Sequence, residues 1–529
     1  SDYYVSYQGD WSQYFTDLDN IKKLKLTDVN QTLTQFLVPQ HRISGDIQPT
    51  PEEQKKALKQ KQASEPAKTL TQTDIQAEPL KDSRVYQQEV AEYVKASKQS
   101  LVNTEKKIQR GTLKNGIQYA LYPTSTRDDK TYATISIDFG TEKSLFNQGE
   151  VLDLMAYLLL RGSDQYSLQD IADKSIEAGG GATANAAGNS ITIQIVAKKE
   201  KFADYFKFML EVLKKPKFEP SQFDLIKSQS LSALDRPYTE PETVAALTMT
   251  RLLETYQPGD LRYHFEPEFS KQQIKAATVE QVKTLYQNFF VSNHAQIAIT
   301  GDYQAKAMLK ILQKEFGGWK AQLPYQRLSS DYQAYPAQKV HTLSEQREFG
   351  NYQSILTFPV GADHPDTPAL MVFSYILGDS QLSSRLAQEL REKNALVYGF
   401  GSGLNLDEWL DSGALTIEAN YTAGKSAQVS QGVHKVLNDL LSKGVTEQEL
   451  EAAKANILKK RVTALEDERN IHRMLTPQLE HHRDLLFREK RDQALAKLTK
   501  ADVDAVIKKY IKLDQFVEVM ADQYGKAQK

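Results

Sequence analysis

This 529-residue chain contains one pattern three times, and the repetition constrains its fold more than any other feature. In each copy, apolar residues follow a leading valine at four, seven and eight positions, which places them on one face of a helix. A short segment of alternating polar and apolar residues comes next and is typical of a strand. The leading valines are Val29, Val282 and Val503, and the strand segments are 43–47, 296–299 and 516–520. Each copy predicts an amphipathic helix, a turn and a strand, with chance agreement as the alternative.

The spacing of the copies predicts the domain organisation. The second and third leading valines lie 221 residues apart, and the first lies 253 residues before the second. If each copy closes a module of roughly 200 residues, the chain begins near the end of one module and then contains two complete ones. We therefore expect the tail of a preceding module at 1–50 and two related modules at 108–322 and 323–529.

A polar segment, residues 51–107, accounts for the longer first interval. It contains Pro51, Pro66 and Pro79 and several stretches rich in lysine, glutamate and glutamine. This composition is typical of a linker. We expect it to be partly helical, over residues 85–103.

The order of elements within the two complete modules predicts the fold class. Expected strands are 112–122, 131–139, 190–198, 354–358 and 415–421. Expected helices are 149–160, 168–178, 202–213, 220–234, 383–393, 425–442 and 446–466, with another beginning at Thr367. This mixture predicts an α+β fold in which each module has a mainly antiparallel sheet covered by helices.

Charge, hydropathy and cysteine content exclude several classes of function. The net charge of -2 gives no reason to expect a nucleic-acid partner or a polybasic membrane contact. No apolar run approaches the ~20 residues that span a bilayer. The chain has no cysteine, so disulfides, thiolate metal sites and cysteine nucleophiles are excluded.

Several local sequences resemble the pitrilysin/insulinase family of zinc peptidases, whose members pair four such modules into two halves that close like a clamshell. Residues 9–11, 28–29 and 39–42 resemble the end of the family's second module, residues 112–116 and 149–163 the start of a third, and residues 391–398 the fourth. The resemblance covers all but the linker. It implies that this chain is the non-zinc-binding half of a peptidase together with the end of the preceding module.

The family's zinc motif is degenerate in this chain. The active half carries His-x-x-Glu-His on a helix, where the two histidines hold zinc and the glutamate polarises the attacking water. The matching positions here are Asp153, Ala156 and Tyr157, and the position of the family's later glutamate ligand is Ala233. Alanine has no donor atom and tyrosine is a poor zinc ligand. The resemblance therefore implies a silent module with no metal or cofactor in this chain, and zinc in the assembled enzyme.

Arg391 and Tyr398 match an arginine and a tyrosine that the family places seven residues apart. In the family they reach across to the active half, where the tyrosine can donate to the scissile carbonyl or the oxyanion and the arginine contacts the peptide. The residues alone leave an equal alternative. Arg391 would then pair with Glu389 or Glu392 at the surface, and Tyr398 would pack in the core.

Two further features carry weaker expectations. A glycine-rich run at 179–186 resembles the turn before the family's edge strand, which in the active half takes the peptide by β-augmentation. Here we expect it to shape a wall or a tight turn before the strand at 190–198. His481 and His482 are expected to be neighbours on a solvated helix, facing different directions.

The leading functional hypothesis is a silent half of a zinc metalloendopeptidase, inactive as an isolated chain. It would enclose and position peptide substrates for an N-terminal, zinc-bearing half in the same precursor or in a separate chain. The alternatives are a non-catalytic scaffold subunit and a clamp that binds peptides without cutting them. The expected compartment is the periplasm, with the cytoplasm as the alternative.

Overall fold

The computed structural model describes residues 12–36, 79–235, 237–345, 348–380 and 383–526. The chain divides into two compact units, residues 1–66 and 67–529. In the first unit the described elements are the helices α2 (Ser12–Lys23) and α3 (Leu26–Phe36). Helix α3 confirms the helix of the first repeat, and its apolar residues Val29, Leu33 and Phe36 are exposed. The predicted strand at 43–47 and the motif segments 9–11 and 39–42 lie outside the described residues.

The second unit contains a six-stranded sheet in the order β1-β2-β6-β3-β5-β4. Its strands are β1 (Gln109–Thr112), β2 (Gln118–Pro123), β3 (Lys130–Asp138), β4 (Gly181–Ala187), β5 (Ser190–Lys198) and β6 (Ala295–Gly301). Only β2 and β6 pair in parallel; the other neighbours are antiparallel. The predicted strands at 112–122 and 131–139 correspond to β2 and β3, which follow each other in the chain but are not neighbours in the sheet. The fully buried strand β6 lies between them and completes the centre of the sheet.

Seven helices of the described residues belong to this sheet's module. They are α6 (Gly149–Leu158), α7 (Leu168–Ala178), α8 (Phe202–Lys214), α9 (Pro220–Leu234), α11 (Pro267–Ala276), α12 (Val279–Phe289) and α13 (Ala305–Phe316). Helix α6 packs on β4 and α8 packs on β5. The alternating isoleucines of β5 point into the core beneath them, where Ile191, Ile193 and Ile195 are completely buried. The period of two in this strand therefore reflects one apolar face.

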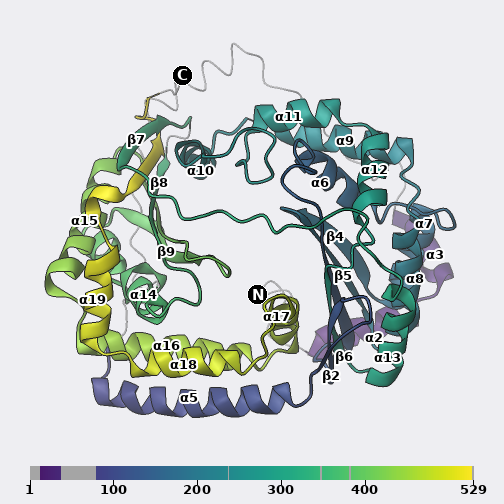
Figure 1. Ribbon diagram of the computed structural model, residues 1–529, viewed down its shortest axis with the longest axis horizontal. Coiled ribbons are helices and arrows are strands. Elements are labelled where there is room, and N and C mark those ends of the chain that lie inside the picture. Colours follow the sequence, from purple (N-terminus) through teal and green to yellow (C-terminus); the bar gives the residue numbers. More distant parts are fainter. Residues whose placement is uncertain (1–11, 37–78, 236, 346–347, 381–382, 527–529) are drawn as a thin grey trace. The chain divides into compact units, whose positions relative to one another are not determined.

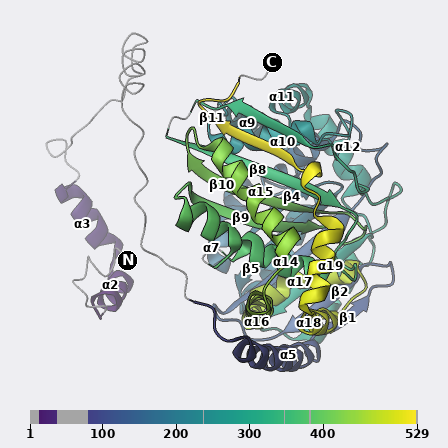
Figure 2. The ribbon, with the colours of Figure 1, turned by 90° about the vertical axis from the view of Figure 1, so that its left-hand side faces the viewer.

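A second, five-stranded sheet has the order β7-β11-β8-β10-β9. Its strands are β7 (Gln338–Leu343), β8 (Phe349–Phe358), β9 (Val397–Leu406), β10 (Gly413–Thr422) and β11 (Val517–Asp522). The helices of this module are α14 (Thr367–Ser374), α15 (Ser426–Lys443), α16 (Glu447–Ala464), α18 (Phe487–Lys497) and α19 (Lys500–Tyr510), with the π-helices η2 (Tyr375–Asp379) and η3 (Ala387–Lys393) and the 3₁₀ turn η4 (Leu513–Gln515). Helix α15 crosses one face of the sheet (Figure 2). Two mainly antiparallel sheets covered by helices confirm the α+β fold class.

The second and third repeats occupy equivalent places in the two sheets. Strand β6 pairs in parallel with β2 and antiparallel with β3, and strand β11 pairs in parallel with β7 and antiparallel with β8. The helix before each strand begins with a threonine capping box, at Thr278 before β6 and at Thr499 before β11. Each threonine hydroxyl accepts a backbone N–H that the first helical turn leaves without a partner. The repeat seen in the sequence is therefore a structural repeat.

The two modules exchange helices. Helix α10 (Pro241–Leu252) lies between α9 and α11 of the first module in the chain but packs on β8 and β11 of the second sheet. Helix α17 (Glu468–Glu480) lies in the second half of the chain but packs on β2, β3 and β6 of the first sheet. Figure 1 shows α10 beside β8 and α17 beside β6. This exchange links the modules into one unit.

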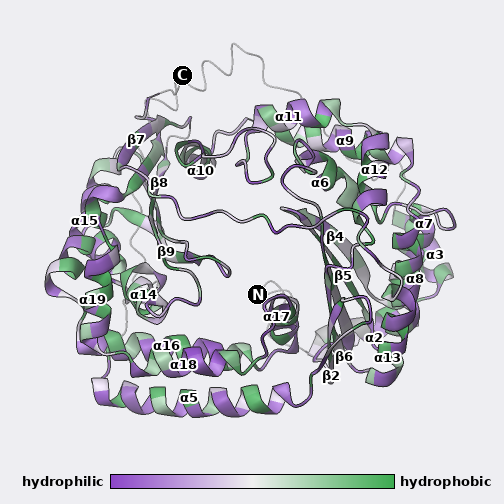
Figure 3. Ribbon diagram, in the orientation of Figure 1, coloured by the Kyte–Doolittle hydropathy of each residue, from purple (hydrophilic) through white to green (hydrophobic). Residues whose placement is uncertain are grey.

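Helix α5 (Ser83–Glu105) confirms the helix predicted within the linker segment. It packs along α16 and α18 of the second module. Figure 3 shows hydrophilic and hydrophobic residues alternating along α5, as expected of a helix that buries one face. At its centre, the buried Ser97 hydroxyl donates to Asp492 of α18 over 2.5 Å.

Candidate functional site

The degenerate zinc-motif positions lie on α6 and α9. Asp153 and Tyr157, four residues apart, share the exposed face of α6, whereas Ala156 is buried. Ala233 is exposed near the end of α9. A catalytic zinc ion needs three protein donors, and these positions supply one carboxylate and one phenol. The residues present do not fit zinc. Among the described ranges, no group of three or more His, Asp or Glu side chains is placed to hold a metal ion.

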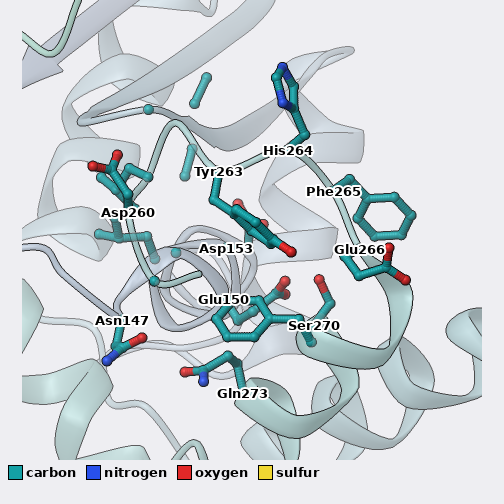
Figure 4. A pocket seen from close by; sticks show the side chains of 18 residues that line it. Asn147, Glu150, Asp153, Asp260, Tyr263, His264, Phe265, Glu266, Ser270 and Gln273 are labelled. Carbon is teal, nitrogen blue, oxygen red and sulfur yellow. The ribbon is translucent and has the colours of Figure 1, made fainter. Parts of the chain in front are cut away.

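A cavity of about 270 Å³ opens beside Asp153 (Figure 4). It lies between the first turns of α6, the segment 259–266 and helix α11. Two of its carboxylates have cationic partners, because Asp260 pairs with Arg262 and Glu266 pairs with Arg251, both at 2.7 Å. The cavity therefore places paired charges close to Asp153.

Asp153 and Glu150 give this cavity its electrostatic character. They are three residues apart on α6, and within the described part of the chain neither forms an ion pair. The partial removal of its carboxyl group from water in the cavity, together with the charge of Glu150, raises the pKa of Asp153 to about 6. Burial also raises the pKa of Glu150, against the effect of its hydrogen bond to Ser270. The pair therefore places two carboxyl groups with raised pKa values three residues apart in the cavity. His264 also lines the cavity, but the three side chains are not placed together to hold a metal ion within the described residues. Glu150 was not among the predicted site residues, although its spacing from Asp153 on a helix was a usable signal.

Tyr398 lies at the start of β9, an edge strand of the second sheet. Its side chain is 45% exposed and its ring meets Phe349 edge-on, with centroids 6.1 Å apart. The expectation that it packs in the core is therefore wrong. Burial of part of the phenol, together with the charge of Glu242 on α10, raises its pKa to about 12. The hydroxyl consequently keeps its proton at neutral pH and can donate a hydrogen bond.

Arg391 lies in η3, which occupies the second part of the helix predicted at 383–393. It is half-buried. Glu389, one of its two predicted partners, is bonded to Lys435 at 2.5 Å and also lies 3.7 Å from Lys393. The cavity at Asp153 is lined by neither Arg391 nor Tyr398, so the structure does not bring the two sets of predicted site residues together there.

The glycine-rich run differs from the expected turn. Residues 181–187 are the edge strand β4 itself, and β5 lies inside the sheet. Only Gly179 and Gly180 form the turn. Gly179 caps α7 with a φ of 61°. A Cβ on Gly180 would lie 1.8 Å from the carbonyl oxygen of Val196, so only glycine fits there.

The two adjacent histidines are not on a helix, because α17 ends at Glu480. His481 stacks on Trp409 with ring centroids 4.0 Å apart. The Nδ1 atom of His482 lies 2.9 Å from Nε2 of Gln118 in the first sheet. His482 therefore contributes to a contact between the two modules, and His481 to a contact within residues 323–529.

Known proteins that match this sequence belong to the peptidase family that the local sequences resemble. The profile of the peptidase M16 inactive domain matches residues 276–457. An uncharacterized zinc protease of Mycobacterium leprae is 27% identical over 203 residues, which cover 37% of this chain and 43% of that protein. The non-peptidase homolog YmxG of Helicobacter pylori is 22% identical over 314 residues, covering 59% of this chain and 70% of the homolog. The chain thus spans less than half of the zinc protease that it matches.

Solved structures share the fold. The peptidase M16 inactive domain from Pseudomonas fluorescens superposes with a TM-score of 0.68 at 20% identity, covering 80% of this chain and 99% of that one. The periplasmic protease PqqL from Escherichia coli superposes with a TM-score of 0.62 at 14% identity, covering 94% of this chain and 55% of that one. No described helix is long and apolar enough to cross a bilayer. The chain belongs to the pitrilysin-like M16 peptidase family and carries an inactive domain of that family.

Proposed function

We propose that this chain is the catalytically silent half of an M16 zinc metalloendopeptidase. It encloses peptide substrates and positions them for hydrolysis at a zinc site in an N-terminal half, carried by the same precursor or by a separate chain. The observation that carries the proposal is helix α6. This helix lies in an M16 fold and keeps a hollow beside Asp153, yet Ala156, Tyr157 and Ala233 remove the metal ligands and the base.

The extent of the fold supports a half-enzyme. The superposition on PqqL covers nearly all of this chain and about half of the protease. We assign residues 108–322 and 323–529 to the two modules of the silent half, residues 51–107 to the linker, and residues 1–50 to the tail of the preceding module. PqqL is described as periplasmic, and we propose the same compartment for this chain.

Arg391 and Tyr398 are the residues through which this half would act on the bound peptide. A protonated, exposed hydroxyl at the start of an edge strand can donate to a scissile carbonyl and to the oxyanion that develops from it. A guanidinium can bind the peptide beside it through charge-assisted hydrogen bonds. Tyr398 is exposed and keeps its proton at neutral pH, and both properties favour this role.

A mixing experiment tests the proposal. The chain is assayed for bound zinc and for cleavage of a quenched fluorescent peptide, first alone and then with its N-terminal half. We expect neither zinc nor cleavage from the chain alone, and cleavage when the zinc-bearing half is added. Rapid cleavage by the isolated chain would overturn the proposal.

The second candidate is a non-catalytic assembly or peptide-binding subunit. The observation in its favour is the match to a Helicobacter pylori protein named as a non-peptidase homolog. The two candidates differ in what the complete assembly does to a peptide. Binding without cleavage by that assembly favours the second candidate, and cleavage favours the first.

A further inference from the structure

A cavity of about 590 Å³ lies in the second module, remote from the zinc-motif positions. It is enclosed by α14, the end of β9, α16 and α18. Apolar side chains form much of its wall and include Met371, Leu404, Leu406 and Leu495. A ligand that fills it therefore needs an apolar part.

The polar part of the wall is dominated by positive charge. Four cationic side chains line the cavity: Arg461, Arg488, Lys490 and Arg491. Only two lining residues are acidic, Asp363 and Glu408. The local charge therefore favours an anion, although the whole chain is close to neutral.

Two of the four cations are already neutralised. Arg461 is bonded to the buried carboxylate of Asp492. Arg491 is bonded to Asp363 at 2.6 Å. Within the described ranges, Arg488 and Lys490 lie within ion-pairing distance of no carboxylate, and Lys490 is exposed to solvent.

Arg488 is the unusual member of the group. Its side chain is half-buried, and its guanidinium donates to the thioether sulfur of Met474, which is a weak acceptor. Burial lowers its pKa, and the neighbouring Arg461 and Arg491 lower it further, against the opposing charges of Asp492 and Glu408. Neither carboxylate lies within ion-pairing distance of Arg488, and a guanidinium partly removed from water without a paired carboxylate is energetically costly. An oxyanion that enters the cavity would supply that counter-ion.

We propose that this cavity is a binding site for a carboxylate attached to an apolar group, with Arg488 as its principal anchor. An arginine fork binds the two oxygens of a carboxylate together, and the leucines of β9 would receive the apolar part. The corresponding peptide group is the C-terminal carboxylate of a chain with an apolar last residue; this identification rests on the proposed peptidase function.

Strand β9 favours a peptide as the source of that carboxylate. It is the edge strand of its sheet, with Tyr398 near its start and Leu404 and Leu406 at its end in the cavity. An edge strand can align an extended peptide through main-chain hydrogen bonds. A peptide that lies parallel to β9 would bring its C-terminus to the end of the strand that lines the cavity with Arg488.

Calorimetric titration of the full chain with N-acetyl-leucine tests the site without any zinc-bearing half or cleavage. Its failure is therefore distinct from a failure of the proposed function. We expect N-acetyl-leucine to bind and N-acetyl-leucinamide, which lacks the carboxylate, to bind at least about tenfold more weakly. Equal binding of the two compounds, or no binding of N-acetyl-leucine, would overturn the proposal.

Variants locate the site. Arg488→Gln should weaken binding about tenfold or more. Lys497→Gln, which removes one positive charge from an exposed position on the same helix, should leave binding unchanged. Arg488→Lys keeps the charge but loses the planar fork of the guanidinium, so its affinity for N-acetyl-leucine should lie between those of the other two variants. Thermal melting confirms that each variant folds. Equal effects of Arg488→Gln and Lys497→Gln would contradict the assignment.

Inorganic phosphate is the second probe, because an arginine fork also accepts it. Weaker binding of phosphate than of N-acetyl-leucine supports the apolar carboxylate. Tighter binding of phosphate would overturn that class of ligand.

Discussion

The Nε2 atom of His472 lies 2.9 Å from the hydroxyl oxygen of Thr134, although 338 residues separate them in the chain. The other ring nitrogen lies 2.9 Å from the hydroxyl of Thr300. Through these two bonds, helix α17 from the second half of the chain is fixed to strands β3 and β6 of the first sheet. The exchange of helices between modules therefore depends on a buried, neutral imidazole.

Stability should fall in acid because of His472. Burial, together with the charge of the adjacent Arg473, lowers its pKa to about 4, against about 6.5 in the unfolded chain. Between pH 6.5 and pH 4 the unfolded chain binds more protons than the folded chain. The contribution of His472 to the free energy of unfolding is therefore complete above pH 6.5 and declines as the pH falls towards 4. From pH 7 to pH 5 we expect a loss of about 2 kcal/mol from this residue.

Urea unfolding at both pH values measures this loss. The loss of about 2 kcal/mol in the free energy of unfolding that His472 causes between pH 7 and pH 5 should be absent from His472→Gln. His482→Gln, at an exposed position, is the control and should keep the difference. An unchanged pH dependence in His472→Gln would show that the imidazole is not held neutral.

The turn before β4 predicts a sharp contrast between adjacent glycines. Gly180→Ala should destabilise the protein by about 1–3 kcal/mol, because its Cβ would collide with the main chain of Val196. Gly181→Ala should change stability little, since no atom lies within 4 Å of the added carbon. Thermal melting of the two variants makes the comparison. Similar melting temperatures would contradict the described turn.

Tyr398→Phe removes only the proposed hydrogen-bond donor. In the assembled enzyme we expect kcat to fall about 10²-fold or more, with a smaller change in KM, because the bond strengthens as negative charge develops on the substrate. Tyr157→Phe is the matched control on an exposed tyrosine of α6 and should keep full activity. Peptide cleavage kinetics of both variants decide the matter, and equal activities would remove Tyr398 from the proposed mechanism.

Much of the fold could be predicted because its signals are local. The helices at 168–178 and 220–234 and the strand at 190–198 match the structure at both ends. Each has a strong period of its own, and capping residues such as Ser167 mark where a helix begins. The repeat in sequence also identified equivalent elements of the two modules.

The elements that were not predicted form because of contacts between residues far apart in the chain, and a local sequence pattern does not reveal such contacts. Strand β4 is built from glycine and alanine, which have low strand propensity, and it forms because β5 offers a partner. The exchange of α10 and α17 joins residues hundreds of positions apart. Helix α10 was not predicted, and the helix expected around His481 and His482 indicated only the region where α17 ends. In the candidate site, the losses at Ala156, Tyr157 and Ala233 could be read from the sequence. The exposure of Tyr398 and the lone guanidinium of Arg488 depend on tertiary packing.

The most direct test of the central claim is a measurement of zinc content and peptide cleavage on the same preparation of the isolated chain, before and after its N-terminal half is added. The chain alone should contain well under one zinc per molecule and cut no peptide, and cleavage should appear only in the mixture. Stoichiometric zinc with cleavage by the chain alone would contradict the account.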